Sequence, residues 1–274
     1  MLRDISKWDR IGYGGKSTLE KEELRSPDKI DYLIKYPRDT KVGVSWEDIT
    51  ELVAAEIGSI LGFETMDVEI VIRNGRRGCL LRNFVRIPEP VPNEEGGVLL
   101  SSFDEYQILQ ATSSLKGNDL IDYGFTLMNK LPYWEKIERK FLEMQFFDII
   151  IGNQDRHPYN WMLMFYSPTD VRLSPIYDNG ASLGFRFDDE KLIEVISNEA
   201  KLNKYTKNTK VKAGLFERKK VKAKEVVDYL LRNYPIESKE IIENIVQFDL
   251  MSYNAYIQGL PILTNSQKEW LMNH

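Results

Sequence analysis

The sequence predicts an α+β protein of two lobes, a small β-rich lobe with one helix and a larger, mostly helical lobe. Short apolar runs rich in strand-forming residues dominate the first part of the chain, whereas runs with helical spacing dominate the second. The composition changes at residues 88–97, which contain Pro88, Pro90, Pro92, Gly96 and Gly97. We therefore expect a first lobe at residues 1–87, a linker at 88–97 and a second lobe at 98–274.

The overall composition is typical of a soluble globular protein. Of the 274 residues, 42% are hydrophobic and 29% are charged, so the chain can bury a substantial core. It contains no apolar run as long as a membrane span, and residues 1–10 lack the apolar segment of a signal peptide. We expect a cytoplasmic protein with no membrane partner.

Cysteine and histidine are too scarce for several kinds of site. Cys79 is the only cysteine, which excludes an internal disulfide and a cysteine-clustered zinc site. Its apolar neighbours Leu80 and Leu81 predict a buried thiol. The only histidines are His157 and His274, so a histidine-rich metal site is excluded as well.

Charge is unevenly distributed along the chain. Residues 201–224 hold ten lysines and arginines and a single acid, Glu217, so this segment carries +9 while the whole chain carries -5. A basic patch on an acidic protein can attract nucleic acid or an acidic partner. A solvated surface or a mobile loop would have the same composition, and both interpretations stay open.

The first candidate for a phosphate contact is a glycine-rich segment at residues 11–21. Its glycines are Gly12, Gly14 and Gly15. Glycine lets backbone amides approach a phosphate closely, and Lys16 or Lys21 could meet the phosphate charge. A flexible turn is the alternative interpretation.

A second candidate is Lys35, near the end of a predicted strand at residues 31–36 that stops before Pro37. A lysine in such a strand can reach the α- and β-phosphates of a nucleotide, although it could also be an ordinary edge-strand lysine. The next segment, 46–61, predicts an amphipathic helix with Ser45 as its N-cap and Gly62 as its stop.

This helix offers three glutamates that could pair with Lys35, namely Glu47, Glu51 and Glu56. Helical geometry puts Glu56 nearest the apolar face, which favours Glu56 as a buried partner. Two strands follow at 68–73 and 78–85, and Asn74-Gly75 between them predicts a tight hairpin.

The second lobe is predicted to be built from helices around one hairpin. Apolar spacing predicts helices at 103–115, with Ser101 or Ser102 as cap, and at 133–150. Strand-like runs at 161–166 and 171–176 predict the hairpin. Further helices are expected at 223–233 and 239–258.

The most informative stretch is 148–184, in which Asp155 precedes Asn160 by five residues and Asp178 stands before Asn179-Gly180. Phosphoryl transfer to a hydroxyl needs one carboxylate to accept the proton, and a second carboxylate with an amide oxygen to hold Mg²⁺. The predicted hairpin would bring Asn160 and Asp178 together. Each residue alone could be an ordinary turn residue, but the combination matches a kinase catalytic loop and metal-binding turn.

Two segments resemble the HipA-like serine/threonine kinases. Residues 153–160, Asn-Gln-Asp-Arg-His-Pro-Tyr-Asn, are similar to that family's Asn-x-Asp-x-His-x-x-Asn loop, and residues 175–183 are similar to its metal-binding turn. The resemblance implies a two-lobed protein-kinase-like fold that uses ATP and Mg²⁺. It implies Asp155 as catalytic base, and Asn160 and Asp178 as Mg²⁺ ligands.

The same resemblance implies Lys35 as the ATP phosphate contact and favours Glu51 as its partner. Gly14, Gly15 and Lys16 are the phosphate-contact candidates of the glycine-rich segment, and in a kinase the base would lie against the backbone around Phe84 and Val85. His157 is implied to support the loop. Helical geometry favours Glu56 where the resemblance favours Glu51, so the partner of Lys35 stays open.

The implied partners are a protein substrate and, in toxin members of the family, an antitoxin. Two departures from the family bear on this. The glycine-rich segment matches only loosely, and we expect the chain to lack the N-terminal subdomain that helps toxin members to bind a DNA-binding antitoxin. Self-phosphorylation of Ser17 or Thr18 in the glycine-rich segment is a further hypothesis, since a phosphate there would repel ATP.

Three other functions remain as alternatives. Phosphoinositide kinases share the Asp-Arg-His-x-x-Asn string but follow it with Asp-Phe-Gly, whereas this chain has Asp178-Asn179-Gly180. Small-molecule phosphotransferases of the aminoglycoside type have a histidine where this chain has Asn153. A pseudokinase that binds a partner through residues 201–224 is the third, and the sequence favours an active serine/threonine protein kinase over all three.

Overall fold

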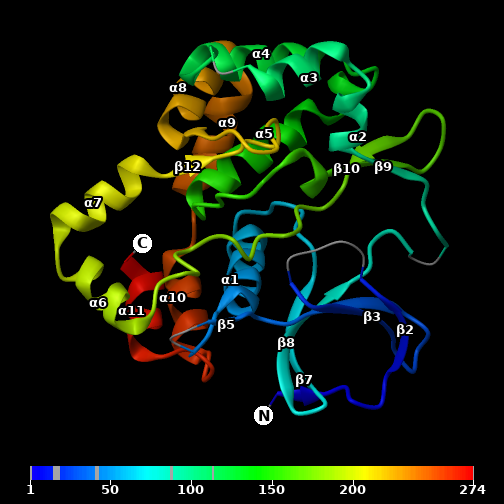
Figure 1. Ribbon diagram of the computed structural model, residues 1–274. Helices are drawn as coiled ribbons and strands as arrows, with labels where there is room; N and C mark the ends of the chain where they lie inside the picture. Colours follow the sequence, from blue (N-terminus) through cyan, green and yellow to red (C-terminus); the bar gives the residue numbers. More distant parts are fainter. Residues whose placement is uncertain (1, 15–18, 41–42, 87–88, 113, 274) are drawn as a thin grey trace.

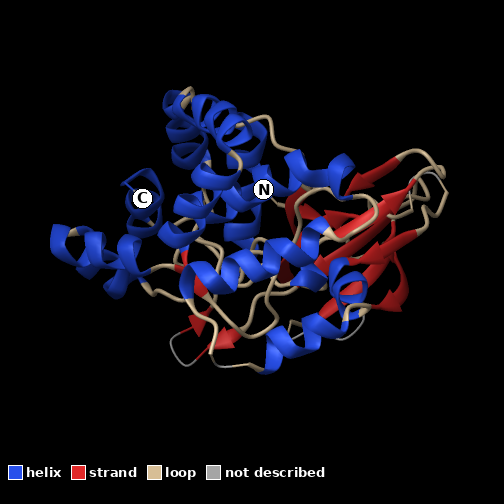
Figure 2. Cartoon of the chain, turned by 90° about the horizontal axis from the view of Figure 1, so that it is seen from above, coloured by secondary structure: helices blue, strands red, loops and turns tan. Residues whose placement is uncertain are grey.

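The computed structural model describes residues 2–14, 19–40, 43–86, 89–112 and 114–273, and it confirms the predicted two-lobed α+β fold. A sheet-rich lobe and a mostly helical lobe lie on either side of helix α1 (Glu47–Ile60), as Figure 1 shows. Figure 2, seen from above, shows most of the strands gathered at the right of the molecule and most of the helices at the left.

The smaller lobe is one twisted sheet. Among the described residues its strands are β1 (Arg3–Asp4), β2 (Asp9–Tyr13), β3 (Lys21–Arg25), β4 (Asp31–Lys35), β7 (Val68–Arg73) and β8 (Arg76–Arg82), in the order β1-β7-β8-β4-β3-β2. Of the strand pairs that the described residues form in this sheet, β1–β7 is parallel and the others are antiparallel. The predicted turn between β7 and β8 is confirmed, because Asn74 and Gly75 have φ of 51° and 76°.

Several strands of this lobe were not predicted, including β1 and β2. Residues 21–25 form β3, although their polar composition gave no strand signal; the pairing with β4 on one side and β2 on the other accounts for the strand. The short strands β5 (Asp39–Thr40) and β6 (Gly43–Val44) were also not predicted.

Helix α1 begins one residue later than predicted, and Ser45 is not its N-cap. Trp46 occupies that position without a side-chain cap, while the Ser45 hydroxyl accepts a hydrogen bond from the Arg38 amide at 3.1 Å. Thus Ser45 stabilises the approach to the helix instead of its first turn. The predicted stop is correct, because Gly62 follows the helix with φ of 67°.

Helix α1 is held by both lobes. It packs against β7 and β8, while its apolar face belongs to the same buried cluster as the helices of the larger lobe. Hydrogen bonds to the larger lobe add to this packing. Thr50 Oγ1 donates to the Gly180 carbonyl at 2.7 Å, and Trp46 Nε1 donates to the Phe187 carbonyl at 3.1 Å. At the other end of the helix, Asn244 Nδ2 donates to the Leu61 carbonyl at 2.6 Å. The position of α1 therefore depends on segments far along the chain.

The larger lobe contains the remaining elements. Its helices are α2 (Gly96–Ser101), α3 (Asp104–Ala111), α4 (Gly117–Asn129), α5 (Trp134–Ile150), the 3₁₀ turn η1 (Pro158–Asn160), α6 (Asp189–Ile196), α7 (Glu199–Asn208), α8 (Ala223–Asn233), α9 (Pro235–Val246), α10 (Leu250–Gly259) and α11 (Asn265–Asn273). Its strands are β9 (Asn93–Glu95), β10 (Met162–Phe165), β11 (Val171–Leu173), β12 (Lys210–Val211) and β13 (Val221–Lys222). The predicted hairpin is β10–β11, and β9, from within residues 88–97, pairs with the other edge of β10.

Two helix predictions for this lobe are wrong in extent. The helix expected at 103–115 ends at Ala111, and α4, which begins at Gly117, was missed because glycine and polar residues open it. The helix expected at 239–258 is two helices. The Asp249 carboxylate accepts a hydrogen bond from the Ser252 amide at 3.0 Å and so starts α10 as a separate helix.

The core of the larger lobe is aromatic. Phe141 on α5 has no exposed surface and lies edge-on to Trp134, Phe125 and Trp161, with ring centroids 5.5–6.1 Å apart. The elements that lead to the candidate site are thus anchored in this aromatic core.

Within the described residues, no helix combines the length and apolar character that a membrane span requires.

This core yields a prediction for stability. Phe141→Ala should lower the free energy of unfolding by about 3–5 kcal/mol, because it removes a buried ring and leaves a cavity. Urea unfolding followed by circular dichroism would measure the change. Val246→Ala, at a position 78% exposed, is the control and should change stability little. A Phe141→Ala protein as stable as the parent would contradict the packing described here.

Candidate active site

Helix α5 delivers the predicted catalytic loop. The chain leaves the helix through Gly152, whose φ is 62°, and enters a loop set by Asn153. The buried Asn153 side chain donates to Asp148 Oδ1 at 3.1 Å and accepts from the Asp155 amide at 2.9 Å. This bridge fixes the backbone of Asp155 and leaves its carboxylate, 49% exposed, directed away from the core.

Arg156 connects the parts of the site and was not assigned a role from the sequence. Its guanidinium is fully buried and forms a salt bridge with Asp148 at 2.9 Å. It also donates to the carbonyls of Asn160 and Tyr177 and to Asn179 Oδ1. Helix α5, the catalytic loop and the Asp178 turn are therefore held by one side chain.

The turn at Asp178 has an unusual backbone. Asp178 has φ of 60°, in the left-handed region that most side chains avoid. Both oxygens of Glu51 accept hydrogen bonds from the next two amides, Asn179 at 2.8 Å and Gly180 at 3.0 Å. A Cβ at Gly180 would lie 2.9 Å from the Glu47 carbonyl oxygen, so only glycine fits against α1 there.

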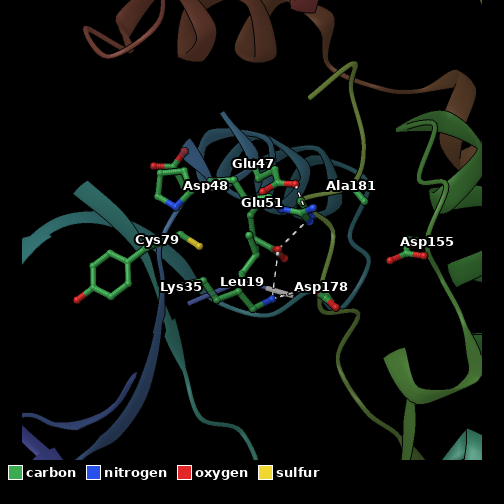
Figure 3. Close-up of a pocket in the computed structure, with 13 residues that line it drawn as sticks. Leu19, Lys35, Glu47, Asp48, Glu51, Cys79, Asp155, Asp178 and Ala181 are labelled. Atoms are coloured by element: carbon green, nitrogen blue, oxygen red, sulfur yellow. Dashed lines mark hydrogen bonds and ion pairs between the residues drawn. The ribbon is translucent and has the colours of Figure 1, made fainter. Parts of the chain in front are cut away.

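Lys35 joins the two lobes at this turn. Its ammonium lies 2.6 Å from Asp178 Oδ1 and 3.7 Å from Glu51 Oε2 (Figure 3). The partner of Lys35 on α1 is therefore Glu51. Glu56, which helical geometry favoured, lies five residues further on and so points in a different direction around the helix.

The charges of this group support each other. Burial alone would favour the neutral amine, but Asp178 and Glu51 raise the pKa of Lys35 above its usual range. Loss of solvation in the space between the lobes likewise opposes ionisation of Asp178, yet Lys35, with smaller effects from Arg156 and His157, lowers its pKa to about 2. Both groups are charged at neutral pH, and each stabilises the charge of the other.

A cavity of about 60 Å³ lies between the lobes. Four of the predicted site residues line it, Lys35, Glu51, Asp155 and Asp178. In Figure 3, Lys35, Glu51 and Asp178 point toward one another, and Asp155 stands apart from them on a different segment of the chain. The structure thus places a cation, the half-exposed carboxylate of Asp155 and the carboxylates of Glu51 and Asp178 around one space.

The other predicted site residues lie around or outside this cavity. Gly14 is close against β3, where an added Cβ would lie 2.4 Å from the Lys21 side chain. The Phe84 ring packs on Tyr177, with centroids 5.5 Å apart, and Val85 follows it in the chain. The structure does not bring Phe84 or Val85 into the cavity. Gly15 and Lys16, together with Ser17 and Thr18, lie outside the described residues.

Asn160 and Asp178 are the candidate Mg²⁺ ligands. Asn160 Nδ2 donates to the Asp155 carbonyl at 3.0 Å, which leaves the amide oxygen as the group to accept a metal. Asp178 is 41% exposed, and only its Oδ1 is hydrogen-bonded to Lys35. No cluster of three or more His, Cys, Asp or Glu side chains is present in the part of the chain that is described. The donors fit Mg²⁺, which commonly takes one or two carboxylates and completes its shell with phosphate oxygens and water.

Lys212 is a further site residue that sequence reasoning missed. Its ammonium lies 2.6 Å from Asp155 Oδ1, and its side chain is only 13% exposed. The Gly214 amide donates to the Arg156 carbonyl at 2.7 Å and so attaches this segment to the catalytic loop. The only sequence signal for Lys212 was the excess of positive charge at 201–224, which gave no hint of its position beside Asp155.

His157 has the environment of a structural residue. Burial lowers its pKa, Asp155 opposes this shift, and Lys212 adds to it. Its ring lies edge-on to Tyr159, with centroids 6.0 Å apart. The neutral imidazole therefore belongs to the packing of the loop.

The buried ion pair at Arg156 yields a testable prediction. Asp148→Asn leaves a buried guanidinium without its counter-charge and should lower the free energy of unfolding by about 3–5 kcal/mol. Urea titration would measure the loss. Glu243→Gln, which removes an exposed pair with Lys239, is the control and should cost at most about 1 kcal/mol. Equal losses from the two variants would show that Arg156 does not depend on Asp148.

Cys79 yields a prediction about reactivity. The side chain is 2% exposed, and burial, followed by the negative charge of Glu51, raises the pKa of its thiol above the usual range. We expect no reaction with a disulfide reagent near neutral pH in the native protein and full reaction after unfolding in guanidinium, because only the thiolate is reactive. Rapid reaction of the native protein would contradict this burial.

The sequence of this chain matches a known protein family. The sequence profile of the HipA-like C-terminal domain matches residues 11–240. Over 176 residues the chain is 26% identical to serine/threonine-protein kinase CtkA of Helicobacter pylori strain J99, a match that covers 60% of this chain and 51% of CtkA. The chain thus spans about half the length of the curated relative that it matches.

Solved structures show the same fold. The crystal structure of the H. pylori proinflammatory kinase CtkA superposes with a TM-score of 0.78 at 20% identity, covering 100% of this chain and 93% of that one. HipA of Shewanella oneidensis MR-1, in its complex with HipB and operator DNA, gives a TM-score of 0.58 at 13% identity and covers 99% of this chain and 65% of that one. At these identities the likeness concerns the fold.

Proposed function

Because the chain belongs to the family of HipA-like C-terminal domains, we propose that it is an ATP- and Mg²⁺-dependent kinase that phosphorylates serine or threonine in a protein substrate. One observation carries the proposal: Lys35, held by Glu51, shares a cavity with Asp178 and with the half-exposed carboxylate of Asp155. This set matches the needs of phosphoryl transfer, in which the protein positions the reactants and neutralises phosphate charge.

Asp155 is the proposed catalytic base. Its carboxylate accepts a hydrogen bond from the substrate hydroxyl and takes the proton as the hydroxyl oxygen bonds to the γ-phosphorus. The bond from the γ-phosphorus to the bridging oxygen breaks, and ADP leaves with that electron pair. Lys212 lies within contact distance of Asp155 and keeps the base in place until the hydroxyl arrives.

The other residues have supporting roles in the proposal. Lys35 contacts the α- and β-phosphates, and Asn160 and Asp178 would hold Mg²⁺, which supplies positive charge to the phosphate oxygens. Gly14, Gly15 and Lys16 would lie over the phosphates. Arg156 acts through the backbone of both metal-ligand segments and is a positioning residue.

The base of ATP is proposed to contact Phe84 and Val85. In the structure the Val85 amide donates to Asn83 Oδ1 at 3.0 Å, and its carbonyl accepts from the Val91 amide at 2.8 Å. Recognition of the base by this backbone therefore requires Asn83 or Val91 to release it. Asn83→Ala should free the amide, and unchanged ATP affinity in that variant would contradict the assignment.

The proposal does not include the pseudokinase, the antitoxin partner or the self-phosphorylation that were considered from the sequence. Lys35, Asp155, Asn160 and Asp178 are all present, which argues against a pseudokinase. Association with an antitoxin and DNA is a property of the S. oneidensis HipA complex, whose likeness to this chain is one of fold. Self-phosphorylation at Ser17 or Thr18 rests on the sequence alone, and mass spectrometry of active protein that found both unmodified would remove it.

The assignment of Asp155 yields a direct prediction. Asp155→Asn should reduce transfer from radiolabelled ATP to a protein or peptide by about 10²–10⁴-fold, because the amide cannot accept the proton. A thermal shift with ATP and Mg²⁺ should persist, since the phosphate contacts are intact.

Asp67→Asn, at a side chain 78% exposed in the smaller lobe, is the control and should behave as the parent. If Asp155→Asn transferred phosphate as fast as the parent, Asp155 would not be the base. Absence of any ATP- and Mg²⁺-dependent shift in the parent would argue against kinase activity itself.

A further inference from the structure

The basic segment borders a hollow beside the catalytic loop. The hollow has a volume of about 630 Å³ and lies between α6, α7, β12 and Gln154, the residue before Asp155. In Figure 1, α6 and α7 lie at one edge of the larger lobe, away from the sheet. Because Gln154 lines the hollow, a segment bound there would lie next to the loop that carries Asp155.

The hollow is lined by five lysines and one acid. The lysines are Lys191, Lys201, Lys204, Lys210 and Lys220. The acid, Glu194, is already paired with Lys191 at 2.7 Å and with Lys201 at 2.6 Å. Across the described ranges, no ion pair is formed by Lys204, Lys210 or Lys220, all of which are exposed. The lining thus has positive charge that the protein itself does not neutralise.

The same cations crowd one another. Lys210 stands directly opposite Lys222 in the β12–β13 pair, an arrangement of like charges that disfavours folding. Burial lowers the pKa of Lys220, against the attraction of Asp155. Nearby cations that lower it further are Lys212, Arg186 and Lys210. Anionic groups placed in the hollow would relieve this repulsion.

The shape and lining favour a peptide over a nucleic acid. Single strands of nucleic acid are usually held by aromatic rings that stack on bases. The aromatic residues of this hollow, Phe187 and Tyr205, pack instead against each other and against Trp270, with centroids 5.3–5.8 Å apart. A lining of lysine ammoniums and apolar side chains suits an extended peptide that carries carboxylates.

We propose that this lysine-lined hollow, called the groove below, binds acidic residues next to the phosphorylated serine or threonine. The kinase would thereby select acidic segments of its protein substrates. The proposal rests on the function proposed above, because it names the substrate class of that site. It assigns a role to the positive charge at residues 201–224.

A pair of peptides tests the groove. Both carry one central serine, flanked in one peptide by Asp and Glu and in its twin by Asn and Gln. Binding of each fluorescein-labelled peptide to the full chain is measured by anisotropy without ATP, and transfer is measured separately as kcat/KM. The acidic peptide should bind more tightly and be the better substrate, and its advantage should shrink as salt rises.

Matched variants locate the effect. Lys204→Gln with Lys210→Gln removes two groove charges, whereas Lys207→Gln with Lys224→Gln removes two charges from the same segment outside the groove. The groove pair should reduce the preference for the acidic peptide by up to about tenfold, as expected for two solvent-accessible ion pairs. The control pair should retain the preference of the parent.

The outcomes separate this inference from the proposed function. If both peptides bound equally and were phosphorylated at equal rates, the proposed role of the groove would be overturned, and the proposed kinase activity would be retained. Groove-dependent binding of the acidic peptide without transfer to any peptide would support the groove and contradict the kinase. Equal losses in both variant pairs would overturn the groove as the site. A single-stranded RNA oligonucleotide that binds through Lys204 and Lys210, with no binding of the acidic peptide, would overturn acidic peptide segments as the ligand of the groove.

Discussion

The buried guanidinium of Arg156 is the interaction on which the arrangement of the site depends. Removing a charged group from water costs several kcal/mol, a cost offset only when a counter-charge and enough acceptors surround it. Arg156 has Asp148 as counter-charge and acceptors on the catalytic loop and on the Asp178 turn. Because the guanidinium is planar and rigid, these acceptors must keep one geometry, and the segments that carry them are fixed as a unit.

Glu51 extends this unit into the other lobe. One carboxylate caps two amides of the Asp178 turn and also lies within ion-pair distance of Lys35. The position of Lys35 on β4 is thereby set by the same group that sets the Asp178 turn. Loss of Glu51 would disturb both the proposed phosphate contact and the proposed metal ligand, so its effects on the two should not be separable.

Sequence reasoning singled out the candidate site residues that have fixed spacing within one segment. Asp155 and Asn160 are five residues apart on one loop, and Asp178 precedes a glycine whose Cβ would strike α1, so local patterns contain their signal. The turn at Asn74-Gly75 could likewise be predicted from the sequence, because it is determined by local backbone conformation.

What the sequence did not reveal depends on contacts between distant segments. Lys212 reaches Asp155 only because the segment after β12 is hydrogen-bonded to the Arg156 carbonyl. Polar β3 is a strand because both neighbours pair with it. Ser45 is not the cap, because its hydroxyl accepts a hydrogen bond from the Arg38 amide. Glu56 was favoured by a pattern that considers one apolar face, whereas α1 contacts the helical lobe on that face and β7 and β8 on its other side.

The shared burial of α1 has a consequence for how the molecule unfolds. Its apolar face lies in the core of the helical lobe, its other side rests on β7 and β8, and Asn244 from α9 holds its end. Neither lobe retains a complete interior if the other melts. Heating should therefore disrupt the sheet and the helices in one cooperative transition, despite the cavity between them, and the two lobes should behave as a single thermodynamic domain.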